Sequence, residues 1–254
     1  MPTETINGHT HHFEDVGQGE PLVYLAATRF DSAKAWVPYM QQYAKGYRVI
    51  MPDPRGLAGS AHVSTVAPAD WVTDLAALLD TLKISSVNLV AETLGTRIAT
   101  RFAADHPERV NTLILNGTIA YSSASGDAQR ASTLSDQRKK DLETHHGADW
   151  EQVNSFYINL HARPEFHEFY DLRTVAPRVS TPTLIMRGDI DDPVHPVIHS
   201  AELHALFPKS WLAIYPNTEF NAMRGRPEES WALINEFIKT RGEAPAKMRP
   251  PGSF

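Results

Sequence analysis

Residues 87–95 read Val-Asn-Leu-Val-Ala-Glu-Thr-Leu-Gly, and this stretch decides the fold. Its first six residues form a short, mostly apolar run, which favours a strand buried on both faces within a parallel sheet. Residues 94–105 continue with the spacing of a helix, and Pro107 is expected to end that helix. The stretch therefore predicts a buried strand, a sharp turn at Thr93 and a helix, one directly after the other.

The same alternation of short apolar strands and amphipathic helices runs through most of the chain. After a hairpin at 3–16, strands are expected at 21–27, 47–52, 87–92, 110–116, 182–187 and 211–215, and helices at 33–44, 69–83, 94–105, 196–206 and 227–240. Alternating strands and helices are typical of an α/β protein. We therefore expect a mostly parallel, twisted sheet with helices on both faces.

Residues 121–180 interrupt this alternation with a polar, helical pattern that carries several aromatic side chains. The interruption predicts a helical cap, 121–180, inserted into a core made of residues 1–120 and 181–241. In open α/β sheets, ligands bind at the carboxyl ends of the strands, so we expect a site between this edge and the cap. The tail, 242–254, is rich in proline and small residues, and we expect it to be disordered.

The composition of the 254 residues narrows the classes of partner. A net charge of −6 argues against nucleic acid and anionic membranes as partners. The chain has no cysteine, which excludes disulfides, thiolate nucleophiles and zinc-thiolate sites. No apolar run reaches the roughly 18–20 residues of a membrane span, and the start lacks a signal-peptide pattern, so we expect a cytoplasmic protein. No His-Glu-x-x-His motif and no glycine-rich phosphate loop is present, so we expect neither a metal nor a cofactor.

Several motifs, in their order along the chain, resemble the α/β-hydrolase family over roughly residues 3–240. The similarity is closest to small capped members such as enol-lactonases and carbon–carbon bond hydrolases. The matching segments are Leu-Ala-Ala-Thr at 25–28 (the oxyanion loop), Asp-Pro-Arg-Gly at 53–56, the turn at 91–95 (the G-x-S-x-G nucleophile elbow), Gly-Asp-Ile-Asp-Asp-Pro at 188–193 (the acid loop) and Pro-Asn-Thr-Glu-Phe at 216–220 (the histidine loop). The resemblance implies the α/β-hydrolase fold, with a capped site at the turn.

Two positions depart from the family pattern. Thr93 stands where the resemblance places the nucleophilic serine, and Phe220 stands where it places the histidine of the triad. The acid position is held by Asp191 or Asp192. The preceding glycine favours Asp191, whereas the prolines that follow favour Asp192.

These departures change what the site can do. A hydroxyl needs a base to become a nucleophile, and phenylalanine has no lone pair. Thr93 is then either functional or simply packed, although a β-branched residue tolerates a strained turn badly. His195 is the candidate for a replacement base, with a surface or packing role as the alternative. Glu92 is either an acid or base of raised pKa, or a carboxylate hydrogen-bonded beneath the turn.

Backbone donors do not depend on the missing side chains. We expect the N–H groups of Leu94 and Thr28 to form an oxyanion hole, which stabilises negative charge on a bound carbonyl oxygen. Further side chains are expected to contact the substrate, or else to pack within the cap and loops. They are Ala27, Arg29, Phe30, Phe220, Trp150 and Tyr157.

The leading functional hypothesis is an enzyme that acts on a small carbonyl compound by oxyanion-hole and acid/base chemistry, without an acyl-enzyme. A lyase, isomerase, cyclase or decarboxylase would fit this description. The first alternative is a ligand-binding protein of this fold that has lost catalysis. The second is a residual ester or lactone hydrolase that uses Thr93. The expected partner is a small molecule, and the sequence leaves a homodimer open.

Overall fold

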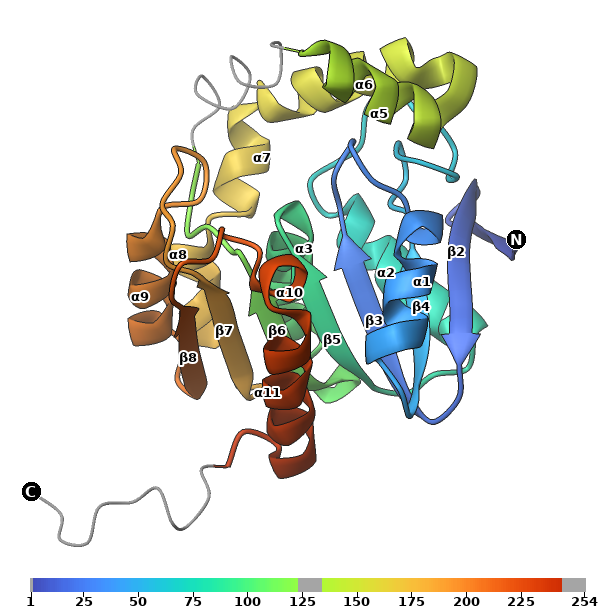
Figure 1. Cartoon of the computed structure of the whole chain (residues 1–254). Coiled ribbons are helices and arrows are strands. Elements are labelled where there is room, and N and C mark those ends of the chain that lie inside the picture. Colours follow the sequence, from blue (N-terminus) through green and yellow to red (C-terminus); the bar gives the residue numbers. More distant parts are fainter. Residues whose placement is uncertain (1, 123–133, 244–254) are drawn as a thin grey trace, which may run out of the picture.

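Eight strands form one sheet in the order β1-β2-β4-β3-β5-β6-β7-β8 (Figure 1). The computed structural model describes residues 2–122 and 134–243. The strands are β1 Thr3–Ile6, β2 His9–Gly17, β3 Glu20–Ala26, β4 Tyr47–Pro52, β5 Val87–Glu92, β6 Val110–Asn116, β7 Thr183–Gly188 and β8 Ser210–Tyr215. β2 pairs with β1 and with β4 in antiparallel fashion. The remaining neighbours, in the order β4-β3-β5-β6-β7-β8, pair in parallel. The predicted α/β fold with a mostly parallel sheet is confirmed.

Helices cover both faces of this sheet. One face carries α1 (Ala33–Tyr43), α10 (Ala222–Gly225) and α11 (Pro227–Thr240), and the other carries α2 (Asp70–Thr81), α3 (Leu94–Asp105) and α9 (Val197–Leu206). The packing of β5 explains why its sequence is mostly apolar. Leu89 and Ala91 pack into the core of one face and Val90 into the core of the other. A central parallel strand has no solvent face.

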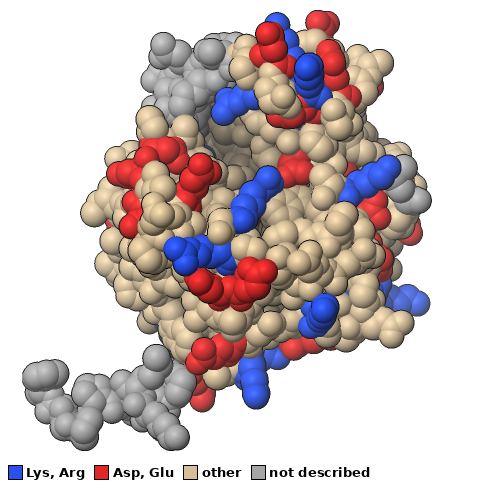
Figure 2. Space-filling view, viewed as in Figure 1, with Lys and Arg blue, Asp and Glu red and all other residues tan. Residues whose placement is uncertain are grey.

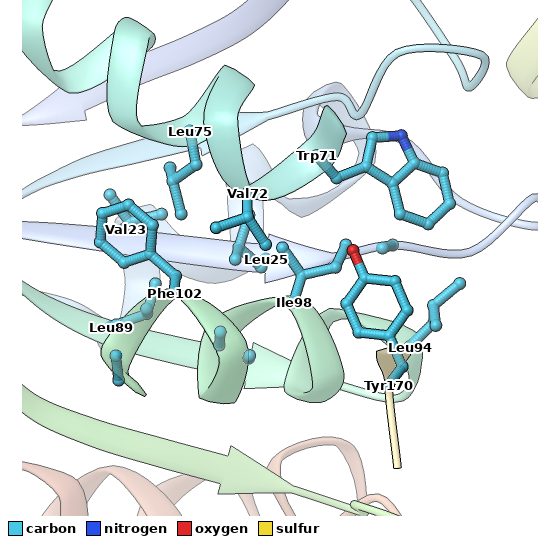
Figure 3. Close-up of a cluster of buried hydrophobic side chains, with 14 of the residues drawn as sticks. Val23, Leu25, Trp71, Val72, Leu75, Leu89, Leu94, Ile98, Phe102 and Tyr170 are labelled. Atoms are coloured by element: carbon cyan, nitrogen blue, oxygen red, sulfur yellow. The ribbon is translucent and has the colours of Figure 1, made fainter. Parts of the chain in front are cut away.

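The core beneath α3 fixes the start of that helix. α3 packs on α2 and on the strands β3 and β5, and Figure 3 shows their side chains interdigitating. The main contributors are Leu94, Ile98 and Phe102 of α3, Trp71, Val72 and Leu75 of α2, and Val23, Leu25 and Leu89 of the sheet. Each buried side chain of this size contributes roughly 1.5–3 kcal/mol. The turn between β5 and α3 therefore rests on a buried hydrophobic core.

Further helices lie between β6 and β7, as the polar, helical pattern predicts. They are α5 (Asp136–His146), α6 (Trp150–His161), α7 (Pro164–Phe169) and α8 (Leu172–Val175). α5 and α6 lie over the carboxyl ends of the parallel strands (Figure 1). Residues 123–133 of the predicted cap, and the predicted disordered tail beyond Glu243, lie outside the described residues. No helix in the two described ranges is long and apolar enough to cross a bilayer.

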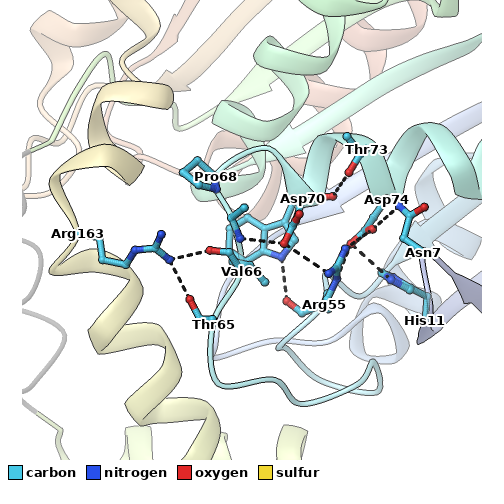
Figure 4. Close-up of polar contacts among 12 residues, drawn as sticks. Asn7, His11, Arg55, Thr65, Val66, Pro68, Asp70, Thr73, Asp74 and Arg163 are labelled. Carbon is cyan, nitrogen blue, oxygen red and sulfur yellow. Dashed lines mark hydrogen bonds and ion pairs between the residues drawn. The ribbon is translucent and has the colours of Figure 1, made fainter.

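Hydrogen bonds tie these helices to the loops of the core. His146 at the end of α5 uses both ring nitrogens: Nδ1 is 3.0 Å from the N–H of Ala58, and Nε2 is 2.7 Å from the carbonyl oxygen of Arg29. Arg163, before α7, donates to the carbonyl oxygen of Val66 at 2.7 Å (Figure 4). The loop that carries Arg29 is therefore held in part by the cap.

The turn at 53–56 is held by its arginine. Arg55 pairs with Asp74 of α2 at 2.6 Å and lies 3.4 Å from Asp70 (Figure 4). Both Arg55 and Asp74 are buried. This pairing fixes the loop after β4 against α2, and it explains the Asp-Pro-Arg-Gly motif as a structural feature.

The cap contact of His146 should make stability depend on pH. Burial lowers the pKa of His146 from 6.5 to about 4, and its Nδ1 can accept from Ala58 only when it is unprotonated. The unfolded chain therefore binds one more proton than the folded chain between these two values. The resulting stability is complete above pH 6.5 and is lost as the pH falls towards 4, by about 2 kcal/mol between pH 7.5 and pH 5.

Urea unfolding at pH 7.5 and at pH 5 measures this loss. Between pH 7.5 and pH 5, we expect the free energy of unfolding of His146→Gln to fall by about 2 kcal/mol less than that of the wild type. His204→Gln is the control, because His204 is an exposed residue of α9. An equal pH dependence in wild type and His146→Gln would contradict the assignment.

Candidate active site

Thr93 lies in the turn between β5 and α3, with φ 50° and ψ −125°. A non-glycine residue with positive φ is strained, and a β-branched residue especially so. The hydroxyl oxygen of Thr93 is buried and has no hydrogen-bond partner in the described part of the chain. The strained turn that the motif predicts is therefore present, and it holds an unpaired hydroxyl.

Gly95 shows how closely α3 approaches the sheet at this turn. A Cβ atom at this position would lie 2.2 Å from the carbonyl oxygen of Leu25 in β3. Only glycine allows this approach. The last residue of the 91–95 motif is thus required by packing and has no need of a chemical role.

A cavity with two lobes opens beside Thr93, beneath the cap. The space-filling view shows a hollow there, with acidic and basic side chains near its rim (Figure 2). The inner lobe has a volume of about 610 Å³ and the outer lobe about 670 Å³. The residues that line both lobes are Thr28, Phe30, Thr93, Arg138, Ile190, Glu219 and Phe220. Volumes of this size suit a small organic ligand.

His195 lines the inner lobe and is paired with Asp192 of the same loop. Its Nδ1 lies 3.3 Å from the Asp192 carboxylate, and its ring stacks on Phe220 at 3.9 Å with an interplanar angle of 7°. Asp192 also accepts the backbone N–H groups of Val194 and His195, at 2.7 and 2.8 Å. The carboxylate, the imidazole and the phenyl ring therefore form one ordered unit.

The charges of this pair follow from its surroundings. Burial lowers the pKa of His195 below its ordinary value, although the charge of Asp192 opposes this effect. Burial alone would raise the pKa of Asp192, but the hydrogen bonds and the charge of His195 hold that pKa below its usual range. At neutral pH the pair is a neutral imidazole beside a carboxylate. A carboxylate that accepts from Nδ1 leaves the lone pair on Nε2.

The two predicted oxyanion donors differ in whether their N–H group already has an acceptor. The N–H of Leu94 lies at the first position of α3, where it has no acceptor within the helix. The N–H of Thr28 donates to the carbonyl oxygen of Ala26 at 2.9 Å. Thr28 lines the cavity, but its predicted role as a second donor is wrong for this conformation, because the N–H is already used.

Glu92 lies below the turn and binds the loop that follows β8. Its carboxylate accepts from Asn221 Nδ2 at 2.6 Å and lies 3.3 Å from Arg224 Nη2. Burial raises the pKa of Glu92, against the charge of Arg224 and the bond from Asn221. The side chain also lines the outer lobe. Of its two predicted roles, the hydrogen-bonded carboxylate beneath the turn is present in the structure.

Three of the predicted site residues lie elsewhere. Asp191 accepts from the N–H of Val197 at 2.6 Å and caps the exposed start of α9, whereas Asp192 faces the cavity. Ala27 is fully buried in the core. Trp150 begins α6 and does not line either lobe. Of the two alternatives for the acid, Asp192 is therefore the one at the cavity, and Ala27 and Trp150 do not line it, because sequence distance from the motifs does not give the direction of a side chain.

Arg29, Phe30 and Tyr157 line the cavity as predicted, and they meet there. The Arg29 guanidinium lies 4.7 Å from the centre of the Phe30 ring and 5.0 Å from that of Tyr157. A core loop and a cap helix thus share one cation–π contact.

Sequence reasoning missed other cavity residues. Arg97 follows Thr93 by one turn of α3, so helical spacing could have identified it. Arg138 comes from α5 of the cap and Arg224 from the short helix α10 that follows β8, and neither carries a sequence signal.

Comparison with known proteins agrees with the fold. Residues 21–143 match the family model described as the alpha/beta hydrolase fold. The meta-cleavage product hydrolase from Pseudomonas fluorescens superposes with a TM-score of 0.76 at 18% identity, covering 94% of this chain and 97% of that protein. The enol-lactonase from Burkholderia xenovorans gives a TM-score of 0.72 at 20% identity, covering 94% and 100%. The chain has the α/β-hydrolase fold.

Two of its sequence relatives bear the names of hydrolases. The (E)-2-((N-methylformamido)methylene)succinate hydrolase of Acinetobacter baylyi is 32% identical over 54% of this chain and 53% of its own length. The 2-hydroxy-6-oxo-2,4-heptadienoate hydrolase of Pseudomonas putida is 27% identical over 89% of this chain and 92% of its own length. The chain spans about half, or less, of the length of the first curated relatives that it matches.

Because Thr93 is strained, its replacement by glycine should stabilise the protein, whereas glycine within a helix destabilises it. Thr93→Gly removes the side chain that disfavours φ 50°, so we expect the free energy of unfolding to rise by about 1 kcal/mol. Thr73→Gly, on an exposed position of α2, is the control and should lower it by roughly 0.5–1 kcal/mol. Urea denaturation of both variants measures the difference. A Thr93→Gly variant destabilised as much as Thr73→Gly would show that the turn is unstrained.

Proposed function

We propose that this protein is an enzyme that moves protons next to the carbonyl group of a small molecule, with His195 as the base. In this proposal Thr93 and Phe220 replace the serine and histidine of the hydrolase triad. The observation that carries it is the His195–Asp192 pair, which faces the same cavity as Thr93 and the N–H of Leu94. Phe220 then serves as the surface on which the new base is stacked.

The residues suit a step without a covalent intermediate. Nε2 of His195 would remove a proton from the carbon next to the carbonyl, and the electrons of that C–H bond would form an enolate. The N–H of Leu94 and the hydroxyl of Thr93 would donate to the enolate oxygen. Where a C=C bond is conjugated with the enolate, the protonated His195 would return its proton to the far carbon of that system, so that the double bond moves and the isomerisation is complete.

The surroundings of the Thr93 hydroxyl support a role for Thr93 as a hydrogen-bond donor to the ligand, with His195 as the base. In a working triad the base is hydrogen-bonded to the nucleophile. Thr93 Oγ1 has no such partner among the described residues, and His195 bonds to Asp192 and stacks on Phe220 instead. Thr93 lines the cavity, and a rotation about its Cα–Cβ bond would turn this buried, unpaired hydroxyl towards a ligand there.

Kinetics of site variants test the base. The substrates would be 2-hydroxy-6-oxo-2,4-heptadienoate, a 1,3-diketone, an enol lactone and an aryl ester. We expect His195→Gln to lower kcat/KM by about 10²–10⁴-fold on any compound that is turned over. Thr93→Val, which keeps the shape but loses the hydroxyl, should lower it by only about tenfold. His204→Gln is the control and should leave kcat/KM unchanged.

The pH profile gives an independent readout. His195 must be neutral to act, so kcat/KM should fall as the pH drops through a value below 6.5. Asp192→Asn removes a charge that raises the pKa of His195. It should therefore move the acidic limb of the kcat/KM profile, where kcat/KM falls, to still lower pH. A limb that Asp192→Asn leaves in place, or turnover that His195→Gln leaves unchanged, would contradict the proposal. Binding of the compounds without any turnover would favour the ligand-binding alternative.

Ester or lactone hydrolysis through Thr93 is the second candidate. It is favoured by the strained turn, which keeps φ 50° despite the β-branch, and by the hydrolase names of the relatives. In this mechanism the Thr93 oxygen bonds to the acyl carbon, its proton passes to His195, and that proton leaves with the alcohol. Water then releases the acid.

Mass spectrometry of the protein quenched during turnover of an aryl ester separates the two candidates. Under the isomerisation proposal, no acyl group is attached to the peptide that contains Thr93, and Thr93→Val retains activity. An acyl adduct on that peptide, absent from Thr93→Val, would replace the isomerisation proposal with hydrolysis.

A further inference from the structure

Arg224 crosses the floor of the outer lobe and is held there by three different elements. Its Nη2 lies 2.6 Å from the carboxylate of Asp31, in the loop after β3, and 3.3 Å from that of Glu92, in β5. Its guanidinium carbon lies 4.4 Å from the centre of the Trp36 ring in α1. A long, flexible side chain is thereby fixed in one position before any ligand arrives.

One side of this guanidinium faces the cavity. The Arg224 side chain is 54% exposed and lines the outer lobe. Both carboxylate contacts use Nη2, and no described residue accepts a hydrogen bond from Nε or Nη1. Burial alone would lower the pKa of Arg224, but the carboxylates of Glu92 and Asp31 raise it, so the group stays charged. Its remaining N–H groups are available to an acceptor in the lobe.

A purely structural role does not account for this arrangement. Neutralising Asp31 and Glu92 requires only the side of the guanidinium that carries Nη2. The opposite side could have been covered by the cap, as the aromatic rings cover Arg29. Instead it is directed to a lobe of about 670 Å³ that Thr93 also lines.

We propose that Arg224 binds a carboxylate of the ligand in the outer lobe, so that the substrate is a carbonyl compound that carries one carboxylate. This inference rests on the proposed function, which places the reacting carbonyl beside Thr93. Charge favours a single carboxylate, because the same lobe is lined by the acids Asp31, Glu92, Asp141 and Glu219 and by only two arginines, Arg138 and Arg224, so no positive charge is left for a second one. A phosphate, with nearly two charges at neutral pH, is disfavoured for the same reason.

Binding of a matched pair of ketones tests the assignment. The probes are 4-oxopentanoate and 2-pentanone, which differ only in a carboxylate at one end and a methyl group in its place. We expect wild-type protein to bind 4-oxopentanoate about tenfold more tightly than 2-pentanone, and this ratio to fall to about one in Arg224→Gln. Arg48→Gln is the control, because Arg48 pairs with Asp15 away from the cavity, and it should keep the wild-type ratio.

A second measurement avoids the variant, since Arg224→Gln leaves two carboxylates without their cation. The Nε–H resonance of Arg224 in the wild-type protein should shift on addition of 4-oxopentanoate and stay in place with 2-pentanone. A wild-type ratio of one, or a preference that survives in Arg224→Gln, would overturn the assignment. The latter result would move the anion to the arginines of the inner lobe.

These outcomes are separable from those of the proposed function, because binding requires no turnover. If the ratio behaves as expected while His195→Gln leaves activity unchanged, only the proposed chemistry fails. If His195→Gln abolishes activity while the wild-type ratio is one, only the role of Arg224 fails.

Discussion

The close approach of α3 to β3 is the constraint on which the site depends. Because Gly95 lies against the carbonyl oxygen of Leu25, the chain must turn sharply between β5 and α3, and Thr93 takes the positive φ that this turn requires. The buried contacts of α3 with α2 and the sheet offset the strain. Thr93 and the N–H of Leu94 are thus presented together by packing, whatever reaction they serve.

The cavity beside this turn is built by loops that depend on one another. The loop after β3 carries Arg29 and Asp31, and it is bound both by His146 of the cap and by Arg224 of α10. Glu92 in turn joins the end of β5 to the loop after β8 through Asn221. Buried polar contacts of this kind are strong only when every member is present. The shape of the cavity is therefore a property of the whole edge of the sheet.

How far the sequence predicts this molecule depends on the range of the interactions involved. The strands and helices of the core were predictable because apolar spacing is local, and the strand 87–92 and the helix 94–105 lie where that spacing indicates. The direction in which loop side chains point was not predictable from the sequence. Asp191 and Asp192 are neighbours, yet one caps α9 and the other faces the cavity, and only the folded path of the loop separates them. Arg224 reaches Asp31 across 193 positions of sequence, a contact that no local pattern contains.

The stacking of His195 on Phe220 gives the side chain at position 220 a physical role. A histidine at position 220 would bring its own base to the cavity, but a phenyl ring there offers only a flat apolar face. That face orients a neighbouring imidazole and shields it from water, and shielding lowers the pKa of His195. Gly117 leaves the space in which the phenyl ring sits, since a Cβ atom there would lie 2.7 Å from Phe220 Cδ2. Phe220 cannot accept a proton, but it helps to hold His195, which can. The Asp192 carboxylate pairs with this same histidine, three residues further along the chain.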